Sequence, residues 1–135
     1  MKFKKVIVGT LSVLMTISLF SIAAKAQTIG LNFRLPAYGS IDSDYANKHD
    51  TEDKAYVRIN SLGWVQRGDS FTFWVVNPNG TQLTDSVSIN SAGSVYNPYY
   101  YGNNGSYYCG WDLKLRMKTG TFTYHECDVT GLFTP

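Results

Sequence analysis

Apolar side chains recur at every second position in several stretches of this chain, and this period is the strongest constraint on its fold. A period of two places one face of an extended strand in a core and the other in water. The longest run occupies six consecutive odd positions: Tyr107, Cys109, Trp111, Leu113, Leu115 and Met117. No stretch after residue 26 keeps the spacing of three and four that an amphipathic helix needs. The sequence therefore predicts an all-β protein.

Shorter alternating stretches cover residues 29–35, 54–60 and 71–76. Pro78-Asn79-Gly80 is typical of a hairpin loop and pairs Asn77 with Thr81. That register sets Val75 opposite Leu83 and Phe71 opposite Val87. Six to seven short strands separated by Gly, Asn and Pro turns favour an antiparallel two-layer β-sandwich. A small β-barrel is the alternative.

The N-terminus has the order of an export signal. Three lysines (Lys2, Lys4 and Lys5) precede an apolar run over residues 6–24, which ends at Ala24-Lys25-Ala26. We expect a signal peptide over 1–26, cleaved after Ala26, and a single secreted β domain over 27–135. An uncleaved membrane helix is the alternative, because nineteen residues span roughly the thickness of a bilayer core. Cleavage would leave an extracellular protein without a stable membrane anchor.

Removing this leader changes the charge of the protein. Four of the twelve basic residues lie in the leader, and all ten acidic residues lie after it, so the mature net charge is −2. A nucleic-acid partner needs a basic stripe that displaces counterions from phosphates. The composition therefore argues against nucleic acid and against a strongly anionic membrane as partners.

The two cysteines, Cys109 and Cys127, both lie in the predicted mature domain. An exported chain meets oxidising conditions, so we predict a disulfide worth about 3 kcal/mol in the entropic picture. A hairpin turning near Lys118-Thr119-Gly120 brings the two cysteines opposite each other if its loop has five residues. A bridge between two sheets, or two free thiols, are the alternatives. Two cysteines are too few for a zinc site, and we predict no metal or cofactor.

An acidic loop follows the first predicted strand. Asp42, Asp44 and Asp53 match three ligand positions of a calcium loop, but Ala46 and Asn47 break the pattern. We interpret the loop as solvated and keep a looser calcium site as the alternative.

The most unusual segment runs over residues 96–111, where tyrosines flank Gly102-Asn103-Asn104-Gly105. We predict a tyrosine-walled hairpin, because tyrosine offers a large amphipathic face while Asn and Gly supply adaptable hydrogen bonds. Pairing of the rings across strands, which would stabilise the sheet, is the alternative. The candidate ligand-binding residues are Tyr99, Tyr100, Tyr101, Tyr107, Tyr108 and Trp111.

Catalysis has little support in this sequence. The two histidines, His49 and His125, belong to no recognisable nucleophile or metal motif. An acid and base set of Asp112, His125 and Glu126 on one sheet face is the only arrangement that suggests a small extracellular hydrolase. We therefore assign no catalytic residue.

Several short motifs follow the leader: Tyr45-Ala46-Asn47-Lys48, Ala55-Tyr56-Val57, the Tyr- and Asn-rich middle and Gly131-Leu132-Phe133-Thr134-Pro135. In these motifs the chain resembles small secreted proteins of Gram-positive bacteria that are grouped as domains of unknown function. The resemblance implies secretion and supplies no catalytic residues. We expect a secreted, non-catalytic binding protein that recognises a cell-surface glycan or protein. A bacteriocin-like antimicrobial effector and a small extracellular hydrolase are the alternatives, and the sequence carries no signal of an oligomeric state.

Overall fold

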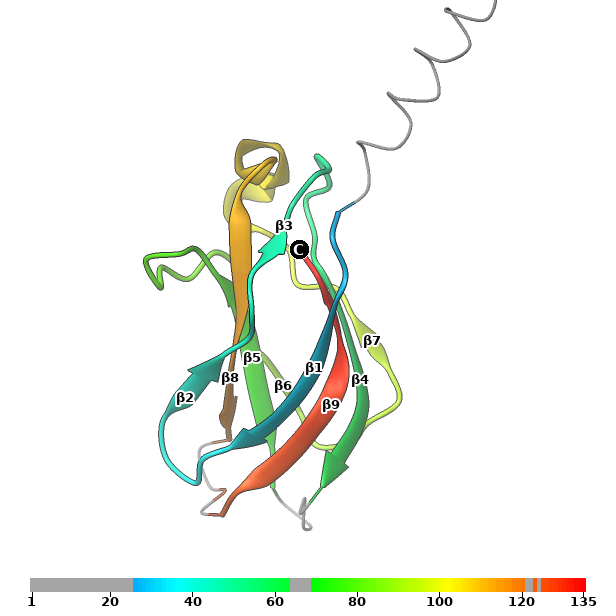
Figure 1. Cartoon of the computed structure of the whole chain (residues 1–135), viewed down its shortest axis with the longest axis vertical. Coiled ribbons are helices and arrows are strands. Elements are labelled where there is room, and N and C mark those ends of the chain that lie inside the picture. Colours follow the sequence, from blue (N-terminus) through cyan, green and yellow to red (C-terminus); the bar gives the residue numbers. More distant parts are fainter. Residues whose placement is uncertain (1–25, 64–68, 121–122, 124) are drawn as a thin grey trace, which may run out of the picture.

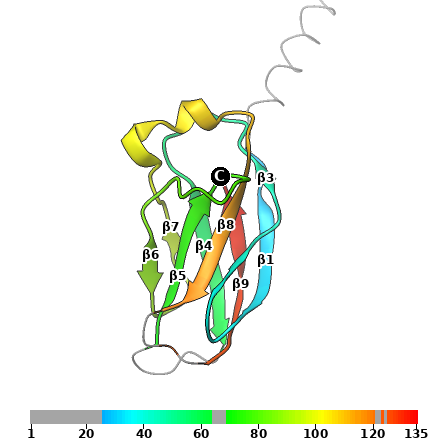
Figure 2. The ribbon, with the colours of Figure 1, turned by 90° about the vertical axis from the view of Figure 1, so that its left-hand side faces the viewer.

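Two antiparallel sheets pack face to face in the computed structural model, which describes residues 26–63, 69–120, 123 and 125–135 (Figures 1 and 2). The sheets do not close into a barrel, so the predicted all-β sandwich is confirmed. The predicted signal peptide lies outside the described residues, apart from Ala26. Within the described part of the chain, no helix is both long and apolar enough to cross a membrane.

The first sheet has the strand order β1-β9-β4-β7, and the second has the order β2-β8-β5-β6 with β3 also paired to β8. The strands are β1 (Ile29–Leu35), β2 (Ser40–Asp42), β3 (Ala46–Asn47), β4 (Tyr56–Gly63), β5 (Phe71–Val76), β6 (Val87–Ile89), β7 (Val95–Tyr96), β8 (Asp112–Thr119) and β9 (Cys127–Thr134). The described residues thus hold nine strands instead of six or seven. The extra ones have two or three residues, which is too short for a period-two pattern to be recognised.

The core lies between the sheets and is built from the predicted inward faces of the long strands. In β1, β4, β5 and β8, most of the side chains predicted to point inward are fully buried, among them Leu35, Val57, Ile59, Phe71, Phe73, Val75, Leu113, Leu115 and Met117. Burying one such side chain contributes about 1.5–3 kcal/mol relative to leaving it in water. These faces hold the two sheets together.

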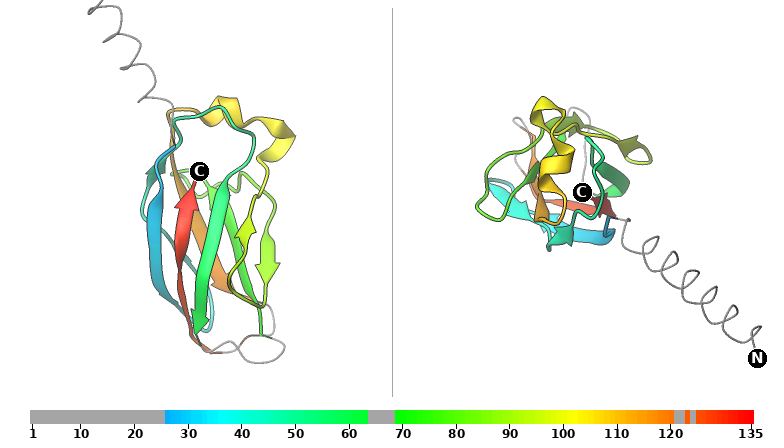
Figure 3. Two further views of the ribbon diagram at one scale, coloured as in Figure 1. Left: turned by 90° about the vertical axis from the view of Figure 1, so that its right-hand side faces the viewer. Right: turned by 90° about the horizontal axis from the view of Figure 1, so that it is seen from above.

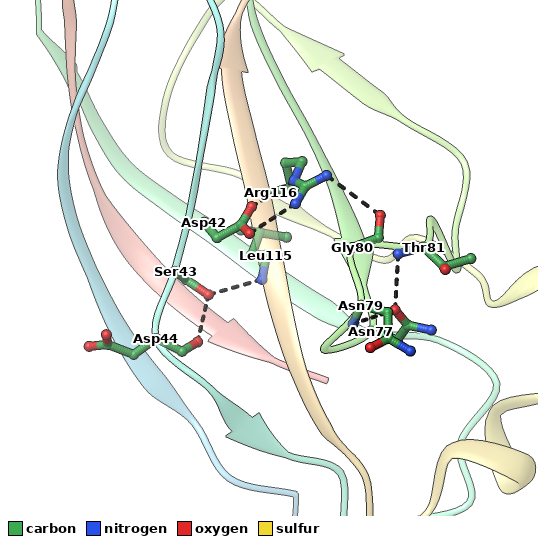
Figure 4. A network of polar contacts seen from close by, with 9 residues as sticks. All are labelled: Asp42, Ser43, Asp44, Asn77, Asn79, Gly80, Thr81, Leu115 and Arg116. Carbon is green, nitrogen blue, oxygen red and sulfur yellow. Dashed lines mark hydrogen bonds and ion pairs between the residues drawn. The ribbon is translucent and has the colours of Figure 1, made fainter.

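The predicted hairpin loop at residues 78–80 is present. The backbone N–H of Asn77 donates to the carbonyl of Thr81 at 3.0 Å, and that of Leu83 donates to Val75 at 2.8 Å. Asn77 Oδ1 accepts hydrogen bonds from the backbone N–H groups of Asn79 and Thr81 (Figure 4). The asparagine side chain therefore closes the turn that the sequence predicts.

Beyond this loop the predicted register is wrong by two residues. Val87 pairs with Phe73 instead of Phe71. The cause lies at Thr84, whose Oγ1 accepts a hydrogen bond from the backbone N–H of Val75 at 3.1 Å. A side chain here replaces a carbonyl of the ladder, and the strand pairing resumes further along the chain.

The predicted hairpin between residues 107–117 and 122–129 is also wrong, because β8 belongs to the second sheet and β9 to the first. The predicted disulfide depends on this hairpin and is wrong as well. Cys109 is an exposed free cysteine beside the start of β8, and Cys127 is a buried free cysteine at the start of β9. The eight residues of β8 run about 26 Å between those two ends of the sandwich. A disulfide needs Cα atoms within about 7 Å of each other.

Candidate functional site

One end of the sandwich, which we call the tip, is formed by residues 48–54 and 97–111. It carries the two short 3₁₀ helices η1 (Tyr101–Asn103) and η2 (Gly105–Tyr108), seen from above in Figure 3. The Tyr-rich segment is therefore not the predicted hairpin. Gly102 and Asn103 have φ angles of 68° and 50°, the left-handed conformation that reverses the chain, so the segment coils over the end of the sheets.

Tyr100 is the buried anchor of the tip, with 1% of its surface exposed. Its backbone N–H donates to the carbonyl of Asp53 at 2.8 Å, and its ring lies 5.4 Å from the ring of Tyr108. Burial raises the pKa of its phenol well above the ordinary value. Its hydroxyl is buried and has no hydrogen-bond partner among the described residues. Tyr100 thus presents no face to a ligand, although the sequence placed it with the candidate binding residues.

Lys48 supports this anchor from a fully buried position. Its Nζ donates to Asp50 Oδ1 at 2.6 Å and lies 4.9 Å from the centre of the Tyr100 ring. Its backbone N–H donates to the carbonyl of Trp111 at 2.9 Å. A buried ammonium is tolerated when a carboxylate and an aromatic face compensate for the lost water. Lys48 therefore ties the Trp111 end of the segment to the tip.

Gly105 fixes η2 against the loop beneath it. Its backbone N–H donates to Asp53 Oδ1 at 3.0 Å. A Cβ atom at this position would collide with the carbonyl of Glu52, so only glycine allows the two backbones to approach so closely.

Tyr107, Tyr108 and Trp111 form a packed group at the tip, which we call the ring cluster. Ring centroids lie 5.2 Å apart for Tyr107 and Tyr108, and 5.6 Å apart for Trp111 and each of the two tyrosines. Tyr107 is 61% exposed and Trp111 is 37% exposed. Tyr108 connects this cluster to the buried ring of Tyr100. The cluster therefore combines exposed ring faces with a buried support.

The other two candidate residues, Tyr99 and Tyr101, are also exposed but lie apart from this cluster. Tyr99 pairs with Lys54, and no ring contact joins Tyr99 or Tyr101 to the cluster within the described residues. Tyr101 and Tyr107 lie in 3₁₀ helices outside both sheets. The alternative, in which the rings pair across neighbouring strands, is therefore wrong for Tyr101 and Tyr107.

Neutral polar side chains precede the ring cluster in the same 3₁₀ segment. Asn103, Asn104 and Ser106 are exposed, and their side chains make no hydrogen bond with any other described residue. Their amide and hydroxyl groups offer both donors and acceptors. Residues 101–108 of the tip therefore present rings together with uncharged hydrogen-bonding groups.

The acid and base set considered for a hydrolase is not assembled. Next to the tip, Asp112 Oδ1 accepts a hydrogen bond from Asn47 Nδ2 at 2.8 Å. At the other end of the sandwich, His125 Nε2 lies 2.6 Å from Asp69 Oδ2. The hydrogen bond from Nδ1 to the Glu126 carbonyl and the contact with Asp69 raise the pKa of His125.

One carboxylate of the acidic loop, that of Asp42, has a structural role. Arg116 donates through Nε and Nη2 to the two oxygens of Asp42, at 2.7 and 3.0 Å (Figure 4). The hydrogen bonds from this guanidinium lower the pKa of Asp42. Ser43 Oγ accepts from the backbone N–H of Leu115 at 2.9 Å and donates to the carbonyl of Asp44. Among the described residues, no group of three or more His, Cys, Asp and Glu side chains is placed to hold a metal ion.

Sequence reasoning missed Lys48 and Asp50, which stabilise the tip. A lysine in a polar loop carries no local signal of burial, because charged loop residues are usually exposed.

Comparison with protein-family models and with curated proteins finds no match for this chain. Its geometry alone indicates the chemistry of the tip, which is suited to stacking against a ligand and hydrogen bonding at its edges.

Proposed function

We propose that this protein is a secreted, non-catalytic binding protein that recognises a cell-surface glycan through the ring cluster of Tyr107, Tyr108 and Trp111. One observation carries the proposal: exposed rings rest on a buried base. Tyr107 and Trp111 contact each other in the open while Tyr108 and Tyr100 support them from below. Rings already fixed in place lose little conformational entropy when a ligand binds.

The surroundings of the cluster favour a glycan over a protein surface. A sugar ring has an apolar C–H face that packs on an aromatic ring, and hydroxyl groups at its edge. Asn103, Asn104 and Ser106 supply matching neutral donors and acceptors. A protein partner of similar affinity typically buries apolar side chains at the centre of the contact.

A glycan array and isolated Gram-positive cell walls test this proposal, with residues 27–135 as the protein. We expect the Tyr107→Ala/Trp111→Ala variant to bind at least about 30-fold more weakly than wild type, the loss that defines a hot spot. Tyr38→Ala is the matched control, because Tyr38 is 75% exposed in the turn between β1 and β2 at the other end of the sandwich. Equal binding by the double variant, with native circular dichroism, would refute the proposal.

Secretion has its own test. The lysines and the apolar run before Ala26 support export and cleavage. We expect the protein recovered from the culture medium of the producing cells to begin at Gln27. Full-length protein retained in the cells would contradict this part of the proposal.

A further inference from the structure

A shallow groove crosses the outer face of the first sheet beside the tip. It consists of two hollows of about 330 Å³ each. Tyr56 lines both hollows, so we call them together the Tyr56 groove. One hollow is lined by Glu52, Asp53, Lys54, Tyr56 and Tyr99, and the other by Thr28, Tyr56, Arg58, Val95, Leu132 and Thr134. Figure 3 (left) faces the sheet that carries the groove.

The strand register builds the floor of this groove. Gly30 pairs with Leu132, Leu132 with Arg58, and Arg58 with Val95, so the four residues form one row across β1, β9, β4 and β7. Gly30 leaves open space above the sheet. Leu132 is 42% exposed and Val95 is 52% exposed. The row therefore combines an apolar floor with one cation.

The acidic and the basic side chains along the groove differ in their partners. Tyr56 donates through its hydroxyl to Glu52 Oε2 at 2.5 Å, and Asp53 Oδ1 accepts from the backbone N–H of Gly105. Lys54 Nζ lies 5.5 Å from the centre of the Tyr56 ring. In the part of the chain that the structure describes, neither Lys54 nor Arg58 has a carboxylate within ion-pair distance. Both acids thus accept hydrogen bonds from the protein, whereas among the described residues neither cation is paired with a carboxylate.

We propose that the Tyr56 groove binds a segment of an acidic glycan, a sugar chain that bears carboxylate or phosphate groups. The rings of Tyr56 and Tyr99 pack against sugar faces, and Lys54 and Arg58 bind the anionic groups. Charge-assisted hydrogen bonds are about twice as strong as neutral ones, and the guanidinium fork matches both carboxylate and phosphate. The inference goes beyond the proposed function, because this surface is distinct from the ring cluster and binds its ligand whether or not the ring cluster does.

Matched sugar probes test the charge requirement. We expect calorimetric titration of residues 27–135 with oligogalacturonate to show saturable binding that weakens as NaCl is raised. The methyl-esterified form of the same oligosaccharide has lost its charge and should bind at least about tenfold more weakly. A glycerol-phosphate teichoic acid tests phosphate as the source of charge. Equal binding of the esterified probe, or no binding of either acidic probe at millimolar concentration, would overturn the proposal.

Surface variants locate the site. Arg58→Gln and Lys54→Gln should each weaken binding of the acidic probe about tenfold. Arg34→Gln is the matched control, because Arg34 lies on the same sheet but is already paired with Asp128 at 2.8 Å. Binding should be unchanged in this control and in the Tyr107→Ala/Trp111→Ala variant. A loss in the control equal to that of Arg58→Gln, a loss in the double variant, or equally tight binding of oligothymidylate would reject an acidic-glycan groove.

Discussion

The two ends of the sandwich differ in whether their unusual side chains are buried or exposed. At the base, the end where β8 finishes and β9 begins, His125 contacts Asp69 at 2.6 Å and Cys127 is buried. At the tip, Tyr100 and Lys48 are buried in the same manner, yet Tyr107 and Trp111 remain open to solvent above them. His125 and Cys127 are thus occupied by the fold, whereas the tip holds a cluster of rings that the core does not use. That difference leads us to place binding at the tip.

Substitution of Tyr100 should have the largest effect on stability. We expect Tyr100→Ala to lower the free energy of unfolding by about 3–5 kcal/mol, because it leaves a cavity the size of an aromatic ring. Tyr107→Ala, which removes an exposed ring, should cost less than about 1 kcal/mol. Urea denaturation of both variants measures the contrast. Similar losses in the two variants would remove the distinction between anchor and exposed ring.

Tyr100→Phe sharpens the same comparison. The Tyr100 hydroxyl is buried without a hydrogen-bond partner in the described residues. Removing it should leave stability unchanged or raise it by about 1 kcal/mol. A marked loss in urea denaturation would show that the hydroxyl has a partner, and that the tip is held differently from this account.

The Lys48–Asp50 ion pair should have the next largest effect. Asp50→Ala leaves a fully buried ammonium without its carboxylate, and we expect a loss of about 3 kcal/mol in the free energy of unfolding. Asp85→Ala removes an exposed carboxylate and should change it by less than about 0.5 kcal/mol. Equal values for the two variants would mean that Lys48 reaches solvent.

The reactivity of the two cysteines gives a direct comparison of the tip with the base. Cys109 is exposed, while burial raises the pKa of the Cys127 thiol to about 11. We expect a maleimide followed by mass spectrometry to label Cys109 about a hundredfold faster than Cys127, because the thiolate is the reactive form and Cys127 must first become accessible. Failure of both thiols to react until a reductant is added would show that they are bridged.

The contact of His125 with Asp69 should give the smallest effect. The pKa of His125 is raised in the folded state, so its contribution to stability is fully present below about pH 6.5, the ordinary value for histidine. It is lost as the pH rises through the raised value. The difference in urea midpoint between wild type and His125→Gln should therefore shrink from about pH 6 to pH 8.5. A difference that grows with pH would contradict this sign.

The sequence predicted the sandwich because its long strands carry the period-two pattern on the faces that become the core. Leu113, Leu115 and Met117 follow that pattern and are fully buried. The connection after Thr119 has the same turn residues as a hairpin but crosses between sheets. Local turn chemistry does not distinguish these two outcomes, so the disulfide prediction failed with the hairpin.

The candidate site was predicted in composition but not in arrangement. The tyrosines of residues 96–111 look alike in sequence, yet Tyr100 is buried and Tyr107 is open. Contacts with distant residues decide this: Tyr100 meets the Asp53 carbonyl and the buried Lys48. Such contacts between segments far apart in the chain leave no local pattern. Composition therefore indicated a binding segment, and only the fold separated its anchor from its exposed rings.

The most direct test of this account is a binding titration of the Tyr107→Ala/Trp111→Ala variant on isolated Gram-positive cell walls, beside Tyr38→Ala. We expect the double variant to bind at least about 30-fold more weakly than wild type, while the control matches wild type. Equal affinity of all three proteins would contradict it and leave the exposed rings of the tip without a role in binding.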